Sequence, residues 1–436
     1  MKNILRSGAG ICCAATLILA SCKSDDTNMQ PEPQSNPGKD WTMATLSAQT
    51  RMINLDDLPA PDTNASVTNY PQVLMERPTS ASFHAPAGFA VNLFQDDVPN
   101  ARTLCVAPNG DVFVGVSAAN KIMILRDEDK DGYAETKFTW DEGGILNRPY
   151  GMAMYQNKLY VANSGAVVRY DYSRGQTKAS GTPTTLGTYP AGGQHPYRSL
   201  VLDTVNQKMY IGIGSTMNVG IEDDPRYASV QVFNINGGTG QTYTSGIRNP
   251  QALAINHASG SPVLWSAVNE RDGIGDQLVP DYFTELATPG LFYGWPYVYL
   301  RADKPDPRIK ATSPMVAATK TPEVLLEAHS AALGLMFYHG TQFPEEYRAD
   351  AYIAMRGSWN RADASGYKIV RVRMNASGKA EGGYEDFLKG WRINEGAGKP
   401  EVFGRPVSLA MASDGSMLIT DDAGGAIWRL RWKGNQ

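Results

Sequence analysis

The sequence predicts an all-β protein folded as a six-bladed β-propeller, and three observations support this prediction. The chain of 436 residues contains 43 glycines and 27 prolines, and only 19% of its residues are charged, a composition that favours a turn-rich β protein. From about residue 84 a short apolar strand, a turn and an alternating strand recur. Repetition of four-stranded units every 40–50 residues or so is typical of propellers. A pair of β-sandwiches and a right-handed β-solenoid are the alternatives.

The repeats are bounded by tight-turn signals such as Asn109-Gly110 and Asp414-Gly415. Six units begin near Arg102, Arg148, Arg198, Asn249, Leu333 and Arg405. We expect the apolar segment 89–94 to pair with the last unit, which would close the ring and remove exposed sheet edges. The pattern lapses between Glu270 and Ala332, and long inserts of this kind usually serve a function.

The N-terminus has the layout of a bacterial lipoprotein signal. Lys2 and Arg6 precede an uncharged run that is too short to span a bilayer, and the run ends in Leu19-Ala-Ser-Cys22, which resembles a lipobox. Cys22 is therefore the predicted lipidation site. Because prolines and polar residues follow, we expect a flexible tether at about 23–45. The predicted organisation is a signal peptide at 1–21, a tether and N-terminal extension at 22–80, and a catalytic propeller at 81–436.

This layout predicts a protein of the bacterial cell envelope that contacts the membrane through its lipid anchor only. The formal net charge of −4 gives no broad cationic field, which excludes general nucleic-acid binding. The sequence contains no Cys-x-x-Cys and no His-Glu-x-x-His, which excludes the zinc and haem sites built on those motifs.

Arginines near the strand starts are the main chemical signal. In a propeller, the loops of successive blades converge at one mouth of the channel, so guanidinium groups gathered there would repel one another without an anion between them. The candidates are Arg148, Arg198, Arg248 with Asn249, Arg356 and Arg405. They predict an anionic ligand. His195, in a Gly/Pro-rich loop three residues before Arg198, is the candidate general base.

Two acidic segments offer oxygen ligands. Asp127, Asp129 and Asp131 have the spacing of an EF-hand loop, but Phe138 stands where the twelfth-position Glu is required. This segment is either a structural calcium loop or a solvated acidic turn. The second segment, 269–276, opens the long insert with clustered carboxylates that suit a hard cation.

Several motifs together resemble the glucose/sorbosone dehydrogenase family of soluble quinoproteins that depend on pyrroloquinoline quinone (PQQ). The matching segments are His195-Pro-Tyr-Arg-Ser-Leu200, Gly246-Ile-Arg-Asn-Pro-Gln251, Val268-Asn-Glu-Arg-Asp-Gly273, Tyr293-Gly-Trp-Pro296, Arg356-Gly-Ser-Trp-Asn-Arg361 and Gly404-Arg-Pro-Val407. The resemblance implies a propeller with PQQ over the channel mouth and Ca²⁺ bound to the quinone.

The same resemblance assigns roles to individual residues. His195 would take the proton of the substrate hydroxyl while a hydride passes to the quinone. The cofactor-binding candidates are Arg198, Arg248, Asn249, Arg356 and Arg405. Glu270 and Arg271 fall where backbone carbonyls that bind Ca²⁺ are expected. The absence of Cys-x-x-Cys-His implies that electrons leave to an external quinone or cytochrome.

The predicted function is therefore oxidation of a sugar, aldose or related aldehyde by a PQQ- and Ca²⁺-dependent dehydrogenase. Two other functions remain as alternatives. One is a Ca²⁺-dependent propeller lactonase or hydrolase, which would need carboxylates rather than arginines at the channel mouth. The other is a propeller that binds a glycan or a protein without catalysis.

Overall fold

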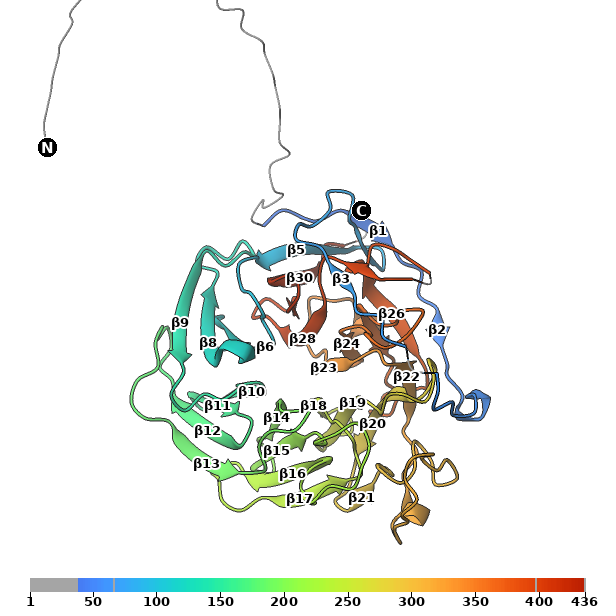
Figure 1. Ribbon diagram of the computed structural model, residues 1–436. Helices are drawn as coiled ribbons and strands as arrows, with labels where there is room; N and C mark the ends of the chain where they lie inside the picture. The colour runs from blue at the N-terminus through green and yellow to red at the C-terminus, as the bar shows by residue number, and fades with distance from the viewer. Residues whose placement is uncertain (1–37, 66, 397, 435–436) are drawn as a thin grey trace, which may run out of the picture. The chain divides into compact units, whose positions relative to one another are not determined.

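The computed structural model describes residues 38–65, 67–396 and 398–434, and these residues fold as an all-β propeller (Figure 1). The predicted signal peptide and Cys22 lie outside them. The helical elements of the described residues are short 3-10 turns: η1 (Leu55–Asp57), η2 (Ser117–Ala119), η3 (Val316–Ala318) and η4 (Glu345–Tyr347). No helix in these ranges has the length and apolar character needed to cross a bilayer.

Five sheets of four or five strands form blades around the central axis (Figure 1). The first contains β6 (Thr103–Val106), β7 (Val112–Val116), β8 (Lys121–Arg126) and β9 (Thr136–Glu142). The second contains β10 (Met152–Tyr155), β11 (Lys158–Ala162), β12 (Ala166–Asp171) and β13 (Thr184–Thr188). The third contains β14 (Arg198–Asp203), β15 (Lys208–Ile213), β16 (Ser229–Asn234), β17 (Gln241–Ser245) and β21 (Leu291–Phe292).

The remaining two blades of this size flank a larger sheet of seven strands, which is described below. One contains β18 (Ala252–Asn256), β19 (Val263–Val268), β20 (Pro280–Leu286) and β22 (Val324–Ala328). The other contains β28 (Pro406–Met411), β29 (Met417–Asp421), β30 (Ala426–Trp432) and β5 (Phe89–Gln95). β5 pairs antiparallel with β30, as expected for closure of the ring.

A seven-stranded sheet lies between these two blades in the ring. It contains β23 (Ala332–Phe337), β24 (Ala351–Met355), β25 (Lys368–Val372), β26 (Tyr384–Lys389), β4 (Phe83–Ala85), β1 (Met43–Thr45) and β2 (Thr50–Arg51). The last three strands come from the N-terminal extension and attach to the outer edge, where β26 pairs with both β2 and β4. A further parallel pair joins β3 (Gln72–Val73) to β27 (Glu401–Val402).

The predicted fold class therefore needs correction, because the sequence predicted a six-bladed propeller behind a flexible tether and the structure does not show six such blades in the part of the chain that it describes. Among the described residues there are five blades of four or five strands, and the other large sheet has seven. The cause is the exposed edge of β26, whose unpaired backbone groups are satisfied by strands of the N-terminal extension. Met43–Thr45, which the sequence placed in the flexible tether, is strand β1 of this sheet. The insert between Glu270 and Ala332 is also more regular than predicted, because it contains β20, β21 and β22.

Aromatic side chains hold the N-terminal extension against the ring. Trp41 packs edge-on against Trp428 of β30, with ring centroids 5.3 Å apart, and its indole N–H donates to the Ala81 carbonyl at 3.0 Å. Phe83 of β4 contacts Trp391 and Trp428, both at 4.9 Å. All four rings are buried. Buried aromatic groups of this size contribute most of the apolar area of such a contact, so the extension is part of the folded body.

The chain direction places the polar loops at one mouth of the channel. In each sheet the innermost strand is followed by an antiparallel hairpin, as in β6–β7 and β14–β15. The innermost strands β6, β10, β14, β18, β23 and β28 pack against one another in this order around the axis. Residues that precede these strands therefore meet at the same end of the channel, where the candidate site lies.

Candidate active site at the channel mouth

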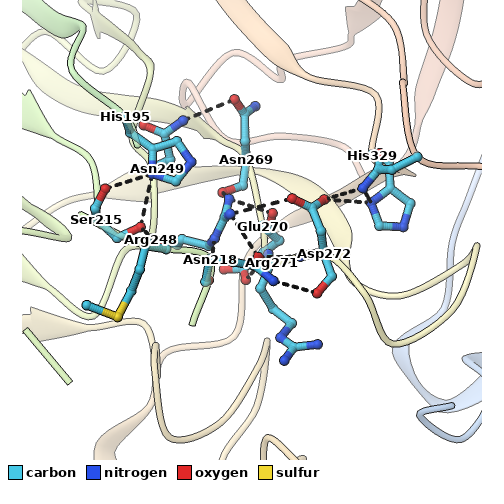
Figure 2. A network of polar contacts seen from close by, with 12 residues as sticks. His195, Ser215, Asn218, Arg248, Asn249, Asn269, Glu270, Arg271, Asp272 and His329 are labelled. Carbon is cyan, nitrogen blue, oxygen red and sulfur yellow. Dashed lines mark hydrogen bonds and ion pairs between the residues drawn. The ribbon is translucent and has the colours of Figure 1, made fainter. Parts of the chain in front are cut away.

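A cavity of about 210 Å³ lies at this mouth, and it is lined by the predicted base and by four of the five predicted cofactor-binding residues. His195 lines it from the loop before β14, Arg248 and Asn249 from the loop before β18, and Arg405 from the loop before β28. Arg356 lines it from the end of β24. Figure 2 shows the polar network on the side of the cavity that contains His195 and Arg248.

The imidazole of His195 is oriented by the backbone. Its Nδ1 lies 2.8 Å from the Ser215 carbonyl oxygen and 3.1 Å from the Ser215 hydroxyl (Figure 2). A carbonyl can only accept, so Nδ1 carries the proton and Nε2 is left with its lone pair. Burial, together with the positive charge of Arg248, lowers the pKa of His195 to about 3. The imidazole is therefore neutral near pH 7, the form that a base requires.

Close backbone approach explains the glycine after β15. A Cβ atom on Gly214 would overlap both the His195 Cβ and the Asn249 amide oxygen. Gly214 therefore serves packing around the base, since a side chain at this position would displace both residues.

Arg198 does not line the cavity. Its Nη1 donates to the His195 carbonyl at 2.5 Å, and its Nη2 donates to the carbonyls of Pro190 and Gly192 at 3.0 and 3.3 Å. The side chain is fully buried. The expected contact with a cofactor thus has no support in this geometry, and Arg198 instead fixes the loop that carries His195. Arg148, at the start of another repeat, also lies outside the cavity lining and is exposed.

Arg248 is the best-anchored cation of the site. It donates from Nε to the Asn218 carbonyl at 2.9 Å, from Nη1 to the Glu270 carbonyl at 2.7 Å and from Nη2 to the Asn218 side-chain oxygen at 3.0 Å (Figure 2). The next residue, Asn249, donates to the side chain of Asn269 at 3.3 Å. Because its position is fixed by several acceptors, Arg248 presents a preorganised positive charge to the cavity.

The expected calcium ligands do not fit this arrangement. The Glu270 carbonyl accepts the hydrogen bond from Arg248, so a guanidinium occupies the place beside it that a cation would take. The Arg271 carbonyl accepts from the Val279 amide at 3.4 Å, and the Arg271 side chain pairs with Asp306 at 2.8 Å. These two carbonyls are therefore already occupied by hydrogen bonds from the protein.

Two buried carboxyl groups line the cavity wall. The side chain of Glu270 accepts from the Arg271 amide at 3.0 Å, and Asp281 accepts from the Glu270 amide at 2.9 Å and from the Ser330 hydroxyl at 3.0 Å. Burial raises the pKa of Glu270 to about 7 and the pKa of Asp281 to about 6. Both groups are thus neutral over part of the acidic range, where carboxyls are usually ionised.

His329 is a functional candidate that sequence reasoning missed. Its Nδ1 lies 2.9 Å from Asp272 Oδ1 (Figure 2), and its Nε2 lies 3.0 Å from the Gly275 carbonyl. Because both partners are acceptors, the geometry favours the doubly protonated ring. Burial opposes this charge, but the contact with Asp272 raises the pKa of His329. The cavity therefore contains one neutral and one readily charged histidine.

The Asp272 carboxylate stays ionised beside this histidine. Burial would raise its pKa, but the hydrogen bond from His329 and the charge of Arg248 bring the pKa to about 2. Asn360 also donates to Asp272 Oδ1, at 2.7 Å. Nothing in the local sequence pattern pairs residues 272 and 329, because 57 residues separate them.

Three further arginines gather around Asp422. Arg356 Nε lies 2.9 Å from Asp422 Oδ2, and Arg102 Nη1 donates to the same oxygen. Arg405 donates to the carbonyls of Arg356 and Gly357 at 3.2 and 2.5 Å. Arg102 also lines the cavity, but the sequence analysis did not include it among the candidate arginines. Its place at the start of the first repeat was the feature that could have identified it.

The charges of this group fit an anionic ligand. Burial, together with the positive charge of Arg356, lowers the pKa of Arg405 to about 10, while the charge of Asp422 acts in the opposite direction. Among the described residues, none accepts a hydrogen bond from the two Nη atoms of Arg356, which lines the cavity. PQQ, with its three carboxylates, matches a site with this donor set.

The Asp127, Asp129 and Asp131 turn lies outside this cavity. Its carboxylate oxygens, with one from Glu135, lie within 4.8 Å of one another. Backbone amides of the same turn donate to all three aspartates: Gly132 to Asp127 at 2.9 Å, Asp131 to Asp129 at 3.1 Å and Tyr133 to Asp131 at 2.8 Å. These bonds organise the turn with or without an ion, so structural calcium there stays a prediction.

Comparisons with known proteins agree with the architecture. A protein of Borreliella burgdorferi, described only as uncharacterized, is 25% identical over 371 residues, which is 81% of this chain and 92% of that protein. A PQQ-dependent pyranose dehydrogenase of Coprinopsis cinerea is 31% identical over 124 residues, but the match covers only 25% of this chain and 16% of that enzyme.

Solved structures are similar at the level of the fold. The PQQ domain of the Coprinopsis cinerea pyranose dehydrogenase, in its holo form, superposes with a TM-score of 0.68 at 19% identity over 81% of this chain and 98% of that domain. A calcium structure of a Trichoderma reesei carbohydrate-active enzyme of family AA12 has a TM-score of 0.68 at 18% identity over 84% and 99% of the two chains. The soluble aldose sugar dehydrogenase of Escherichia coli has a TM-score of 0.57 at 15% identity over 80% and 100%.

These neighbours confirm the resemblance to soluble quinoprotein dehydrogenases that the motifs predicted. The sequence model of a family described as TrAA12-like matches residues 83–281 and 309–433, which is most of the chain. The chain therefore belongs to the TrAA12-like family.

Proposed function

We propose that this protein is a PQQ-dependent dehydrogenase that oxidises the hydroxyl or aldehyde carbon of a sugar. The observation that carries the proposal is one cavity that contains a neutral, backbone-oriented His195 and the four arginines Arg102, Arg248, Arg356 and Arg405. The named relatives, a PQQ-dependent pyranose dehydrogenase and an aldose sugar dehydrogenase, support the same chemistry.

The arginines would hold the cofactor by its carboxylates. Arg356 and Arg405 supply mutually repelling charges that an anion relieves, and Arg248 supplies a fixed charge beside His195. When bound, PQQ supplies the quinone that accepts two electrons from the substrate as a hydride. A ligand with several carboxylates is favoured over a single anion because the cations come from different strands around the mouth.

His195 takes the proton in this scheme. Its Nε2 lone pair receives the proton of the substrate hydroxyl as the C–H hydride leaves, so that a carbonyl product forms. The Ser215 carbonyl then stabilises the imidazolium, because it already accepts the Nδ1 proton. Arg198 keeps the loop in place through its bond to the His195 carbonyl.

Reconstitution tests the proposal. PQQ binding to the purified full chain is measured by calorimetry, and dye reduction is followed over a panel of pyranoses, open-chain aldoses and aldehydes. Turnover that is lost in His195→Ala while PQQ still binds supports the proposal, whereas PQQ binding without turnover on any sugar or aldehyde contradicts it.

The same assay after chelation, with and without added Ca²⁺, tests the calcium requirement that the family resemblance suggests. Addition of quinone or cytochrome acceptors in place of the dye tests the expected external acceptor.

We also propose that the enzyme is attached to the bacterial cell envelope through a lipid on Cys22. The support is the sequence of residues 2–22, with its basic start, apolar run and lipobox-like end. Expression of the full chain should place it in the membrane fraction, and Cys22→Ser should release it. A Cys22→Ser protein that stays in the membrane fraction would contradict the assignment.

A further inference from the structure

An exposed aromatic pair stands at the rim of the cavity. The rings of Tyr70 and Trp359 are stacked, with centroids 5.3 Å apart and an interplanar angle of 17°. Tyr70 is 59% exposed and Trp359 is 40% exposed, and Trp359 lines the cavity that contains His195. Exposed apolar groups beside a pocket are a common mark of a ligand surface, because leaving them in water has a free-energy cost.

The chain around Trp359 holds this side chain in place. Ser358 and Asn360, on either side of it, are both buried. The Ser358 hydroxyl accepts from the Ser365 amide at 3.0 Å, and Asn360 donates to Asp272 at 2.7 Å. The two neighbours are thus tied into the protein, and Trp359 alone is left at the surface. A side chain positioned in this way loses little conformational freedom when it binds a ligand.

The N-terminal extension brings Tyr70 to the same place. The Asn69 amide donates to the Trp359 carbonyl at 2.7 Å, and the Asn69 side chain donates to the carbonyls of Arg361 and Gly398 at 3.1 and 2.9 Å. The Gln72 amide donates to the Pro400 carbonyl at 2.8 Å. Tyr70 precedes the residues that match the family model, which begin at 83, so this half of the pair is supplied by the N-terminal extension.

We propose that Tyr70 and Trp359 form an aromatic platform that binds a pyranose ring of the substrate, so that the N-terminal extension is part of the substrate site. This inference rests on the proposed function, which makes the substrate a sugar. The carbon-bound hydrogens of a pyranose form an apolar face that packs on a flat aromatic surface, while its hydroxyls need polar partners. Gln194, whose exposed side chain lines the same cavity next to the base, supplies an amide for that purpose.

Steady-state kinetics of the PQQ-loaded protein test the platform. Trp359→Ala and Tyr70→Ala should raise KM for the preferred pyranose on the order of 2–10-fold and leave kcat within about twofold, since stacking on a binding platform acts on the bound ground state and the transition state alike. Tyr70→Phe retains the ring and should therefore raise KM less than Tyr70→Ala does. Met75→Ala is the matched control, since Met75 is fully exposed in the same segment.

A second measurement separates this inference from the proposed function. The affinity of the cofactor-free protein for the sugar, and separately for PQQ, is measured by calorimetry in Tyr70→Ala. Weaker sugar binding with unchanged PQQ binding supports the platform even when no sugar is oxidised, in which case the dehydrogenase proposal alone fails. Unchanged sugar affinity and unchanged KM in both alanine variants overturn the platform while the dehydrogenase proposal stands. Loss of PQQ affinity in Tyr70→Ala would also overturn it, because the pair would then serve the cofactor.

Discussion

The Nδ1 atom of His195 lies 2.8 Å from the carbonyl oxygen of Ser215, and this contact decides which ring nitrogen acts as the base. Because the carbonyl fixes the proton on Nδ1, proton transfer is assigned to Nε2. His195→Gln should lower kcat on the order of 10²–10⁴-fold and leave PQQ affinity within about twofold. Ser215→Ala is the control, since it retains the carbonyl and removes only the hydroxyl. Equal losses of kcat in the two variants would contradict the assignment.

The pKa of His195 gives a prediction about pH. In the cofactor-free protein the pKa of about 3 reflects burial first and then the charge of Arg248. Because the pKa in the unfolded chain is near 6.5, the unfolded state takes up a proton that the folded state does not, and this group lowers stability as the pH falls from about 6.5 towards 3. Bound PQQ adds negative charge near Arg248 and should raise the pKa. Titration of the His195 Cε1 signal by NMR, assigned with His195→Gln, measures both values, and a pKa of 6 to 7 without PQQ would refute the prediction.

Asp422 should contribute to the stability of the protein mainly when no anionic ligand is bound in the cavity. The charges of Arg102 and Arg356 keep the pKa of Asp422 low against the effect of burial. Asp422→Asn leaves these arginines and Arg405 without a counter-charge, which should destabilise the cofactor-free protein by about 3–5 kcal/mol in urea unfolding. Saturating PQQ should then raise the melting temperature more in the variant than in the unchanged protein.

The exposed pair of Arg226 and Asp224 provides the control for this experiment. Its two side chains are 49% and 32% exposed, so Asp224→Asn should change stability by less than about 1 kcal/mol. An Asp422→Asn protein as stable as this control would show that the arginine cluster is not under electrostatic strain.

Much of the candidate site could be predicted from the sequence because residues at equivalent positions in the repeats face the same mouth of the channel. The predicted gathering of Arg248, Arg356 and Arg405 near His195 depended on this rule, and the three share one cavity with it. The rule fails for Arg148, which is exposed in the loop before β10, and for Arg198, whose guanidinium is held by the carbonyls of Pro190 and His195.

The features that could not be predicted from the sequence depend on contacts between segments that are distant in the chain. His329 meets Asp272 across 57 residues, and β4 meets β26 across some 300, without any local pattern that pairs them. The seven-stranded sheet could not be predicted for the same reason, because it forms when strands of the N-terminal extension pair with β26. Strands of two or three residues such as β1, β2 and β4 are too short to show the alternation from which strands are predicted.

Structural calcium at Asp127, Asp129 and Asp131 can be tested through stability. Their carboxylate oxygens are close enough to share one ion, and an ion that binds only the folded state stabilises it by about 2.7 kcal/mol at 100 times its Kd. Millimolar Ca²⁺ should therefore raise the melting temperature of the cofactor-free protein, and Asp129→Ala should abolish the rise. A rise of the same size in Asp129→Ala would place the ion elsewhere or show that the turn is only solvated.

Glu270 should make the cofactor-free protein less stable as the pH rises. Burial raises its pKa to about 7 from an ordinary value of 4.5, so the folded state retains a proton that the unfolded chain has lost. The stability linked to this group is complete below about pH 4.5 and is lost as the pH rises through 7, with a total on the order of 3 kcal/mol. Glu270→Gln retains an acceptor for the Arg271 amide and cannot ionise, so its unfolding free energy should fall less between pH 5 and 8. Some dependence will persist because burial also raises the pKa of Asp281, to about 6. Urea unfolding at several pH values measures the difference, and parallel profiles for the two proteins would show that Glu270 is ionised in the folded state throughout this range.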